Sequence, residues 1–186
     1  MLEDCPRLTE LELTSAILEG DTLNRFLDLA PRLTRLKLER CRTGNPYVSW
    51  ENWPPFPELR DLTLRLEEFV SWKDQLRLFE RADKLESLSW HYGGTGLHHR
   101  DDFMKALDDL LCEGAWPRLV SLQLTEPQRG SMSVITDVLL ARVLEHCPKG
   151  GLRRLILPSA DFADRSWKAF GRHSMTIQVL TLSTSS

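Results

Sequence analysis

The stretch LTRLKL at residues 33–38 places three leucines in a spacing that returns as LRDLTL at residues 59–64. Seven copies of this LxxLxL pattern run along the chain, with Trp90 replacing a leucine in the fourth copy and Ile177 in the seventh. The copies begin at Leu8, Leu33, Leu59, Leu85, Leu119, Leu152 and Ile177. They are separated by 25, 26, 26, 34, 33 and 25 residues. Such a period predicts an array of similar structural units that stack on one another.

Each LxL segment is expected to be a short strand whose leucines face the core while the residues between them face outward. One strand cannot bury its leucines alone, so the copies are expected to stack into a parallel sheet over one shared core. A proline stands just before the motif in four copies and is expected to end the preceding helix and to start the extended segment. These prolines are Pro6, Pro31, Pro57 and Pro117.

Apolar residues at helical spacing predict helices over about residues 21–30, 71–82, 101–111, 133–147 and 164–172. Residues 47–55, rich in aromatic residues and proline, are expected to be irregular. The predicted fold class is therefore α/β, a right-handed leucine-rich-repeat solenoid. Its horseshoe has the parallel sheet on the concave side and the helices on the convex side.

Composition excludes several classes of protein. The 24 basic and 27 acidic residues give a net charge of −3, without the basic surplus of a nucleic-acid binder. No apolar run approaches the roughly 18 residues that a membrane span needs, and no secretory signal is recognisable. The four cysteines are far apart and form no CxxC pair, so neither a zinc site nor a disulfide framework is predicted. We therefore expect a reduced, intracellular protein, cytoplasmic or nuclear.

Enzymatic activity, a cofactor and a metal are not expected, because the chain has no GxSxG, HExxH or dinucleotide-binding motif. The loop at residues 91–102 has three glycines and three histidines. It lacks the ending of a phosphate-binding loop, and its adjacent His98 and His99 would point apart in an extended chain. This loop is expected to be an insertion, with contact to a partner as the alternative.

Two short stretches, LEDCP at residues 2–6 and LEHCP at residues 144–148, resemble the helix ends of fungal F-box/leucine-rich-repeat proteins. Residues 162–179 resemble the terminal repeats of that family. The resemblance implies repeats that recognise a substrate, and an upstream F-box that docks on the Skp-type adaptor of a cullin–RING ubiquitin ligase. The first repeat starts at Leu8, so residues 1–186 are expected to form a single domain of about seven repeats without an F-box. Because neither end shows an evident polar cap, a piece of a longer array is expected, with a complete protein that has minimal caps as the alternative. The adaptor is expected as a partner only if an F-box lies upstream.

The resulting hypothesis is a protein-recognition scaffold similar to the substrate-binding part of such a ligase. One alternative is a GTPase-activating leucine-rich-repeat protein like the Ran activator, although the acidic tail usual in that family is missing. The other alternative is a structural repeat fragment with no partner of its own.

Outward-facing strand residues form the predicted binding surface. Reading across neighbouring strands, the sets Glu10–Arg35–Asp61, Glu12–Lys37 and Glu39–Arg65 alternate in sign. They are either a self-paired ladder that steadies the sheet or a groove for a peptide or protein. If Glu10 and Asp61 occupy Arg35, then Lys37 and Arg65 are expected to remain free for a ligand. The candidate partner-binding residues are Arg35, Lys37, Asp61, Arg65, Ser89, His91, His98 and His99.

Overall fold

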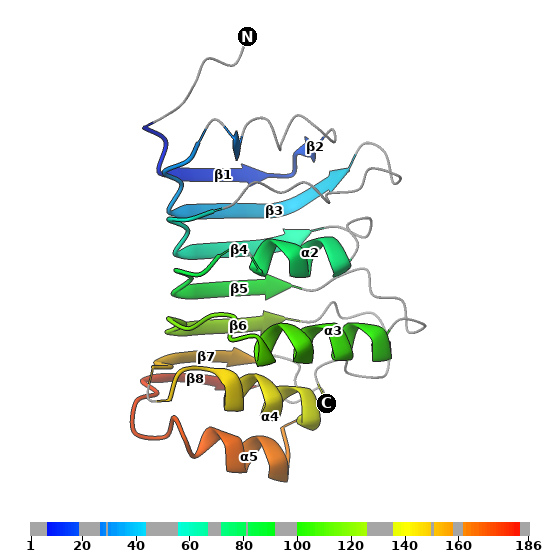
Figure 1. Cartoon of the computed structure of the whole chain (residues 1–186), viewed down its shortest axis with the longest axis vertical. Coiled ribbons are helices and arrows are strands. Elements are labelled where there is room, and N and C mark those ends of the chain that lie inside the picture. The colour runs from blue at the N-terminus through cyan, green and yellow to red at the C-terminus, as the bar shows by residue number, and fades with distance from the viewer. Residues whose placement is uncertain are drawn as a thin grey trace.

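The computed structural model describes residues 7–18, 27–28, 30–43, 56–66, 72–80, 82–91, 100–125, 136–149, 151–157 and 162–182. Seven strands lie side by side in chain order and form one all-parallel sheet (Figure 1). They are β1 (Glu10–Thr14), β3 (Arg35–Thr43), β4 (Asp61–Leu66), β5 (Ser87–His91), β6 (Ser121–Thr125), β7 (Arg154–Leu157) and β8 (Val179–Leu182). The two-residue strand β2 (Ile17–Leu18) also pairs with β3. The prediction of a parallel sheet is confirmed.

Each copy of the motif pairs with the matching position of the next copy. Leu36 of β3 stands opposite Leu62 of β4, and Leu62 stands opposite Leu88 of β5. The strands also begin in the same way, because one backbone carbonyl accepts two N–H groups of the next repeat. The carbonyl of Thr9 accepts from Thr34 and Arg35, at 2.8 and 3.0 Å, and this pattern recurs up to β8. The constant register puts equivalent side chains of all repeats in straight rows across the sheet.

The turn before the strand explains the proline of the motif. The N–H of Leu33 donates to the carbonyl of Ala30 at 3.1 Å and closes a turn with Pro31 in its second position. Proline is favoured there because its ring fixes φ near the value that the turn requires. The same turn closes over residues 56–59, 82–85 and 116–119, with proline, aspartate and proline in that position. As predicted, the prolines stand at the turn that leads into the strand.

In the part of the chain that the structure describes, four helices cover one face of the sheet (Figure 1). They are α2 (Trp72–Phe79), α3 (Arg100–Cys112), α4 (Asp137–His146) and α5 (Asp164–Phe170), close to four of the predicted ranges. Residues 27–28 are also helical, while most of the predicted helix over 21–30, and all of 47–55, lie outside the described residues. No helix in the described part of the chain is long and apolar enough to span a membrane.

Between the sheet and the helices lies a continuous apolar core. It contains every motif leucine of the copies that begin at Leu33, Leu59, Leu119 and Leu152, all of them buried. Trp90, in the third leucine position of its copy, is buried too, and its ring packs edge-on against Phe79 with 4.7 Å between centroids. One face of the sheet thus packs against the helices, and the opposite face is the one that can contact another molecule.

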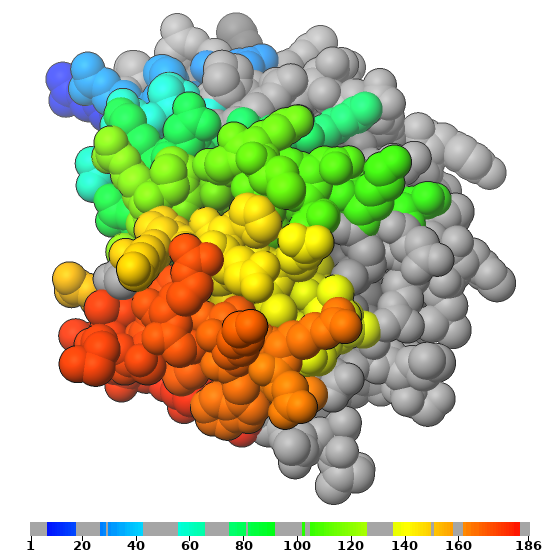
Figure 2. Space-filling view, turned by 60° about the horizontal axis from the view of Figure 1, so that its bottom comes forward, coloured from blue at the N-terminus to red at the C-terminus, as the bar shows by residue number. Residues whose placement is uncertain are grey.

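The stack is less well covered at its two ends. Leu11 and Leu13 of β1 are only half-buried. Leu180 and Leu182 of β8 are 40% and 38% exposed, whereas Leu155 in the neighbouring strand is fully buried. Figure 2 shows the β8 end, with α5 in orange and the segment that contains β8 in red at the surface. The depth of burial of a leucine therefore depends on whether a further repeat covers it.

Candidate functional site

The predicted binding residues that the structure describes lie on the sheet face opposite the helices, where the side chains between the leucines are half-buried or exposed. Six of them come from three adjacent strands: Arg35 and Lys37 from β3, Asp61 and Arg65 from β4, and Ser89 and His91 from β5. The register aligns three rows: Glu10–Arg35–Asp61–Ser87, Glu12–Lys37–Thr63–Ser89 and Thr14–Glu39–Arg65–His91. The remaining two candidates, His98 and His99, lie outside the described residues.

In the first row, Arg35 stands between two carboxylates at the outer limit of an ion pair. Its Nη1 lies 4.0 Å from Oε2 of Glu10, and its Nε lies 3.7 Å from Oδ2 of Asp61. Burial raises the pKa of Asp61, and the charge of Glu10 adds to this, while Arg35 acts in the opposite direction. The Arg35 side chain remains 52% exposed. Loose, exposed pairs of this kind contribute only about 0–1 kcal/mol each.

The second row is held much more tightly. Nζ of Lys37 donates to Oε1 of Glu12 at 2.6 Å and lies 3.2 Å from Oε2 of Glu39. These hydrogen bonds raise the pKa of Lys37, and the bond from Lys37 lowers the pKa of Glu12. The Lys37 side chain is only 27% exposed. The expectation that Lys37 remains free for a ligand is therefore wrong, because its ammonium group makes short contacts with two carboxylates at once.

Glu39 of the third row connects this row with the second row. Its Oε1 lies 3.6 Å from Nη1 of Arg65, so this half-buried carboxylate contacts both Lys37 and Arg65. Arg65 is therefore paired as well, although its side chain is 56% exposed. Glu39 belonged to the predicted ladder but not to the candidate binding residues. The signal was present in the sequence, because Glu39 follows Lys37 at the strand period of two and faces Arg65 across the register.

His91 lies beside Arg65 in the same row. Burial lowers the pKa of His91, and the positive charge of Arg65 lowers it further. The imidazole is therefore neutral at pH 7 and offers one hydrogen-bond donor and one acceptor. Beyond it the face becomes uncharged, with the half-buried residues Ser87, Ser89, Ser121, Gln123 and Thr125 on β5 and β6. The face is thus charged over β1, β3 and β4 and uncharged over β5 and β6.

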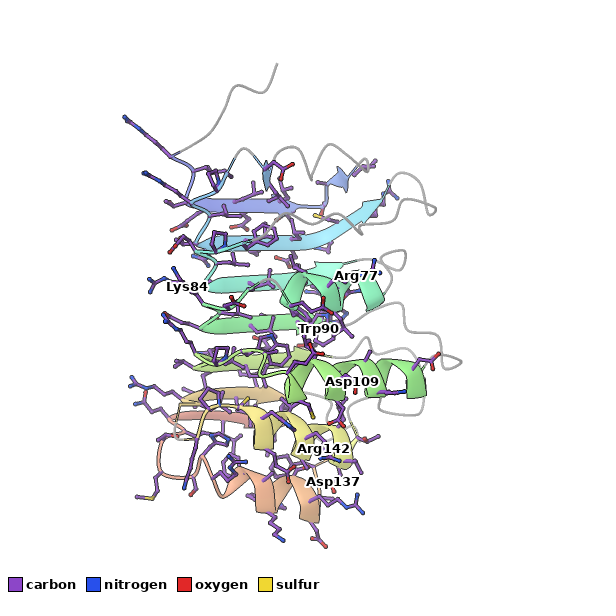
Figure 3. The ribbon with its side chains drawn as sticks, viewed as in Figure 1. Arg77, Lys84, Trp90, Asp109, Asp137 and Arg142 are labelled. Atoms are coloured by element: carbon purple, nitrogen blue, oxygen red, sulfur yellow. The ribbon has the colours of Figure 1, made fainter. Side chains whose placement is uncertain are left out.

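A second ladder, which the sequence analysis missed, runs along the edge where the strands begin. Nζ of Lys84 donates to Oε1 of Glu58 at 2.7 Å, and Nη1 of Arg60 donates to Oε1 of Glu86 at 3.1 Å. Figure 3 shows Lys84 at this edge of the sheet. The signal was again positional, since both pairs join residues 26 apart, one repeat.

This face can therefore offer charges of both signs, and uncharged hydrogen-bond donors and acceptors, on a fixed backbone. The described residues contain no group of three or more metal-ligating side chains. No protein-family model, curated protein or solved structure matches the chain. What the surface does must be argued from its own geometry.

Proposed function

We propose that the chain is a leucine-rich-repeat solenoid of horseshoe shape that binds another protein on its concave sheet face. In this respect it would resemble the substrate-binding part of an SCF-type F-box protein. The observation that carries the proposal is the polar face of a seven-stranded parallel sheet, which none of the described helices covers and whose opposite face is buried. Docking on a Skp-type adaptor would require an F-box, so the proposal concerns recognition alone.

Distances decide which charges are available to the partner. The contacts of Arg35 and Arg65 are 3.6–4.0 Å long, and both side chains are more than half exposed. Each guanidinium can exchange its present contact for a carboxylate of the partner at small cost, and a bidentate pair would be stronger than the present one. Lys37 instead stays with Glu12 and Glu39 and fixes the positions of these two carboxylates.

Asp61, Ser89 and His91 complete the proposed surface. They supply a carboxylate, a hydroxyl and a neutral imidazole from strands that the backbone ladder already holds in place. Little conformational entropy is therefore lost when a partner binds. Because both signs of charge are present, complementarity selects the partner and suppresses wrong ones. The expected partner is a protein segment with acidic and basic side chains and a polar, uncharged stretch opposite β5 and β6.

The experiment uses the purified chain as bait in a cell extract, with the variants Arg35→Ala and Arg65→Ala. Arg60→Ala is the matched control, because Arg60 has the same 52% side-chain exposure as Arg35 and an ion pair of its own, but lies at the strand edge. We expect the two sheet-face variants to lose capture of the partner with an unchanged Tm, while the control retains it.

A photo-crosslinking residue at position 89 should label the same partner, and one at the exposed position 105 on α3 should not. Loss of stability with unchanged capture in Arg35→Ala and Arg65→Ala would show that the ladder is structural and that the proposed surface is wrong.

A further inference from the structure

Cys112 and His146 meet where α3 and α4 end. Sγ of Cys112 lies 3.6 Å from Nε2 of His146. The other ring nitrogen, Nδ1, lies 2.8 Å from the carbonyl oxygen of Arg142. A carbonyl only accepts hydrogen bonds, so Nδ1 carries the hydrogen, and in the neutral imidazole the lone pair of Nε2 faces the thiol. A nucleophile, a base and a group that orients the base are thus in contact.

The other described cysteines show how unusual this environment is within the chain. Cys41 and Cys147 are buried, and burial raises the pKa of Cys147 to about 12. Such thiols behave as small apolar side chains and remain unreactive while the protein is folded. Cys112 is exposed and has an imidazole beside it. It is therefore the described cysteine with both access to solvent and a base.

A basic pocket opens next to His146; Cys112 is not among the residues that line it. It has a volume of about 570 Å³ and lies between α4 and α5, lined by Arg142, Glu145, His146, Lys168, Ala169 and Arg172. Three permanent cations thus line the pocket together with a single carboxylate. Figure 3 shows Arg142 on α4.

The existing contacts leave part of this positive charge uncompensated. Nη1 of Arg172 donates to the backbone carbonyl of Glu145 at 2.5 Å, which does not neutralise its charge. Nε of Arg142 lies 3.6 Å from Oδ1 of Asp108. Within the described part of the chain, no carboxylate lies within ion-pair distance of Lys168. The pocket therefore favours a small anion, and His146, which lines it and contacts Sγ of Cys112, connects it with the thiol.

We propose that Cys112 and this basic pocket form a thiol–disulfide exchange site for anionic, low-molecular-weight disulfides. Nε2 of His146 takes the proton of the Cys112 thiol, and the sulfur attacks one sulfur of the bound disulfide. The disulfide bond breaks, its second sulfur leaves as a thiolate, and this thiolate takes the proton back from His146. Cys112 ends in a mixed disulfide, and one equivalent of free thiol is released.

The pocket cations bind the carboxylates of the disulfide, and His146 moves the proton. The site lies on the helix side of the molecule, so it is independent of the recognition surface proposed for the opposite face of the sheet. The product would place new negative charge in the basic pocket, where Lys168 and Arg172 would hold it.

The test measures the rate at which Cys112 in the folded chain reacts with two disulfides of opposite charge. The anionic probe is 5,5′-dithiobis(2-nitrobenzoate), and the cationic probe is cystamine. Mass spectrometry of peptides assigns each modified cysteine. For Cys112 in the folded chain, we expect the rate constant with the anionic probe, divided by that with the cationic probe, to be about tenfold larger than in the urea-unfolded chain. This ratio should fall as added salt screens the charges of the pocket. Cys41 and Cys147 should stay unmodified until the protein unfolds.

Two variants separate the roles of base and pocket. His146→Gln should slow the reaction of Cys112 with both probes by at least about tenfold. Lys168→Glu should slow the anionic probe alone, and Lys149→Glu, with the same change of net charge outside the pocket lining, should leave both rates unchanged. An equal ratio of the two rate constants in the folded and unfolded chain, or an unchanged rate of Cys112 in His146→Gln, would overturn the proposal. The Cys112–His146 contact would then only tie α3 to α4.

Discussion

The indole N–H of Trp90 donates a 2.7 Å hydrogen bond to the side-chain oxygen of Gln75, and both side chains are buried. Trp90 occupies the third leucine position of its copy, so the substitution for leucine brings a polar N–H group into the core (Figure 3). Gln75 on α2 supplies the acceptor that this group needs. The fourth copy thus departs from the leucine pattern, but Gln75 compensates for the polar group that Trp90 introduces.

Replacing Gln75 tests this compensation. Gln75→Leu keeps the bulk of the side chain but takes this acceptor away from the buried N–H group of Trp90. We expect the free energy of unfolding in urea to fall by about 1–3 kcal/mol. In a double-mutant cycle with Trp90→Phe, the second substitution should cost less in the Gln75→Leu background than alone, because the donor that has lost this acceptor is then absent. Strictly additive effects would contradict the pairing.

The burial of the motif leucines predicts that equivalent substitutions have different effects along the stack. Leu122→Ala, in the middle of the sheet, should lower the free energy of unfolding by about 2–5 kcal/mol, because it leaves a cavity between two covering repeats. Leu180→Ala, at the equivalent position of β8, which is 40% exposed, should cost less than half as much. Equilibrium unfolding of the two variants in urea decides this, and equal losses would show that β8 is covered in solution.

The leucine triplets were sufficient to predict the strands, because a period of two allows only one face of each strand to hold leucines, and stacking then fixes the register. The alternation of charge predicted which residues meet across the strands. It did not predict that Lys37 is held more closely than Arg35, since this depends on where each side chain places its charge. Cys112 and His146 escaped prediction because they lie 34 residues apart on separate helices, and the sequence pattern carries no sign of their contact.

Asp137 also makes contacts, with residues 26–29 positions away, that the sequence did not predict. It lies in the first turn of α4, yet its carboxylate caps the next helix, accepting hydrogen bonds from the backbone N–H groups of Ala163, Arg165 and Ser166 at 2.9–3.2 Å and from the Ser166 hydroxyl. Ala163, at the N-cap position of α5, has no side-chain oxygen to do this. Burial acts to raise the pKa of Asp137, but these hydrogen bonds outweigh it and hold the pKa below its ordinary value of 3.8.

Asp137→Asn removes the charge and turns one of the two accepting oxygens into an NH2 group, so it should lower stability at pH 7 by about 1 kcal/mol. A carboxyl group whose pKa is lowered on folding stabilises the protein above its unfolded pKa, and this contribution disappears as the pH falls through the folded pKa. The difference in Tm between wild type and variant should accordingly shrink below about pH 4. Asp109→Asn, on the exposed surface of α3, is the control and should match the wild type at pH 7. A difference in Tm that stays constant from pH 7 to pH 2 would contradict this role for Asp137.

The last prediction concerns the ladder on the sheet face. Lys37→Met removes the cation that separates Glu12 from Glu39 and leaves two carboxylates without their shared partner. We expect a larger decrease in Tm than for Arg35→Met, because the contacts of Arg35 are longer and its side chain is more exposed. The difference between Lys37→Met and wild type should diminish in about 1 M salt, where the Debye length falls to about 3 Å. Adding Glu39→Gln to Lys37→Met should recover part of the lost Tm, since it removes one of the two repelling charges. Equal Tm values for Lys37→Met and Arg35→Met at low salt would show that the short Lys37–Glu12 contact contributes no more than the loose pairs beside it.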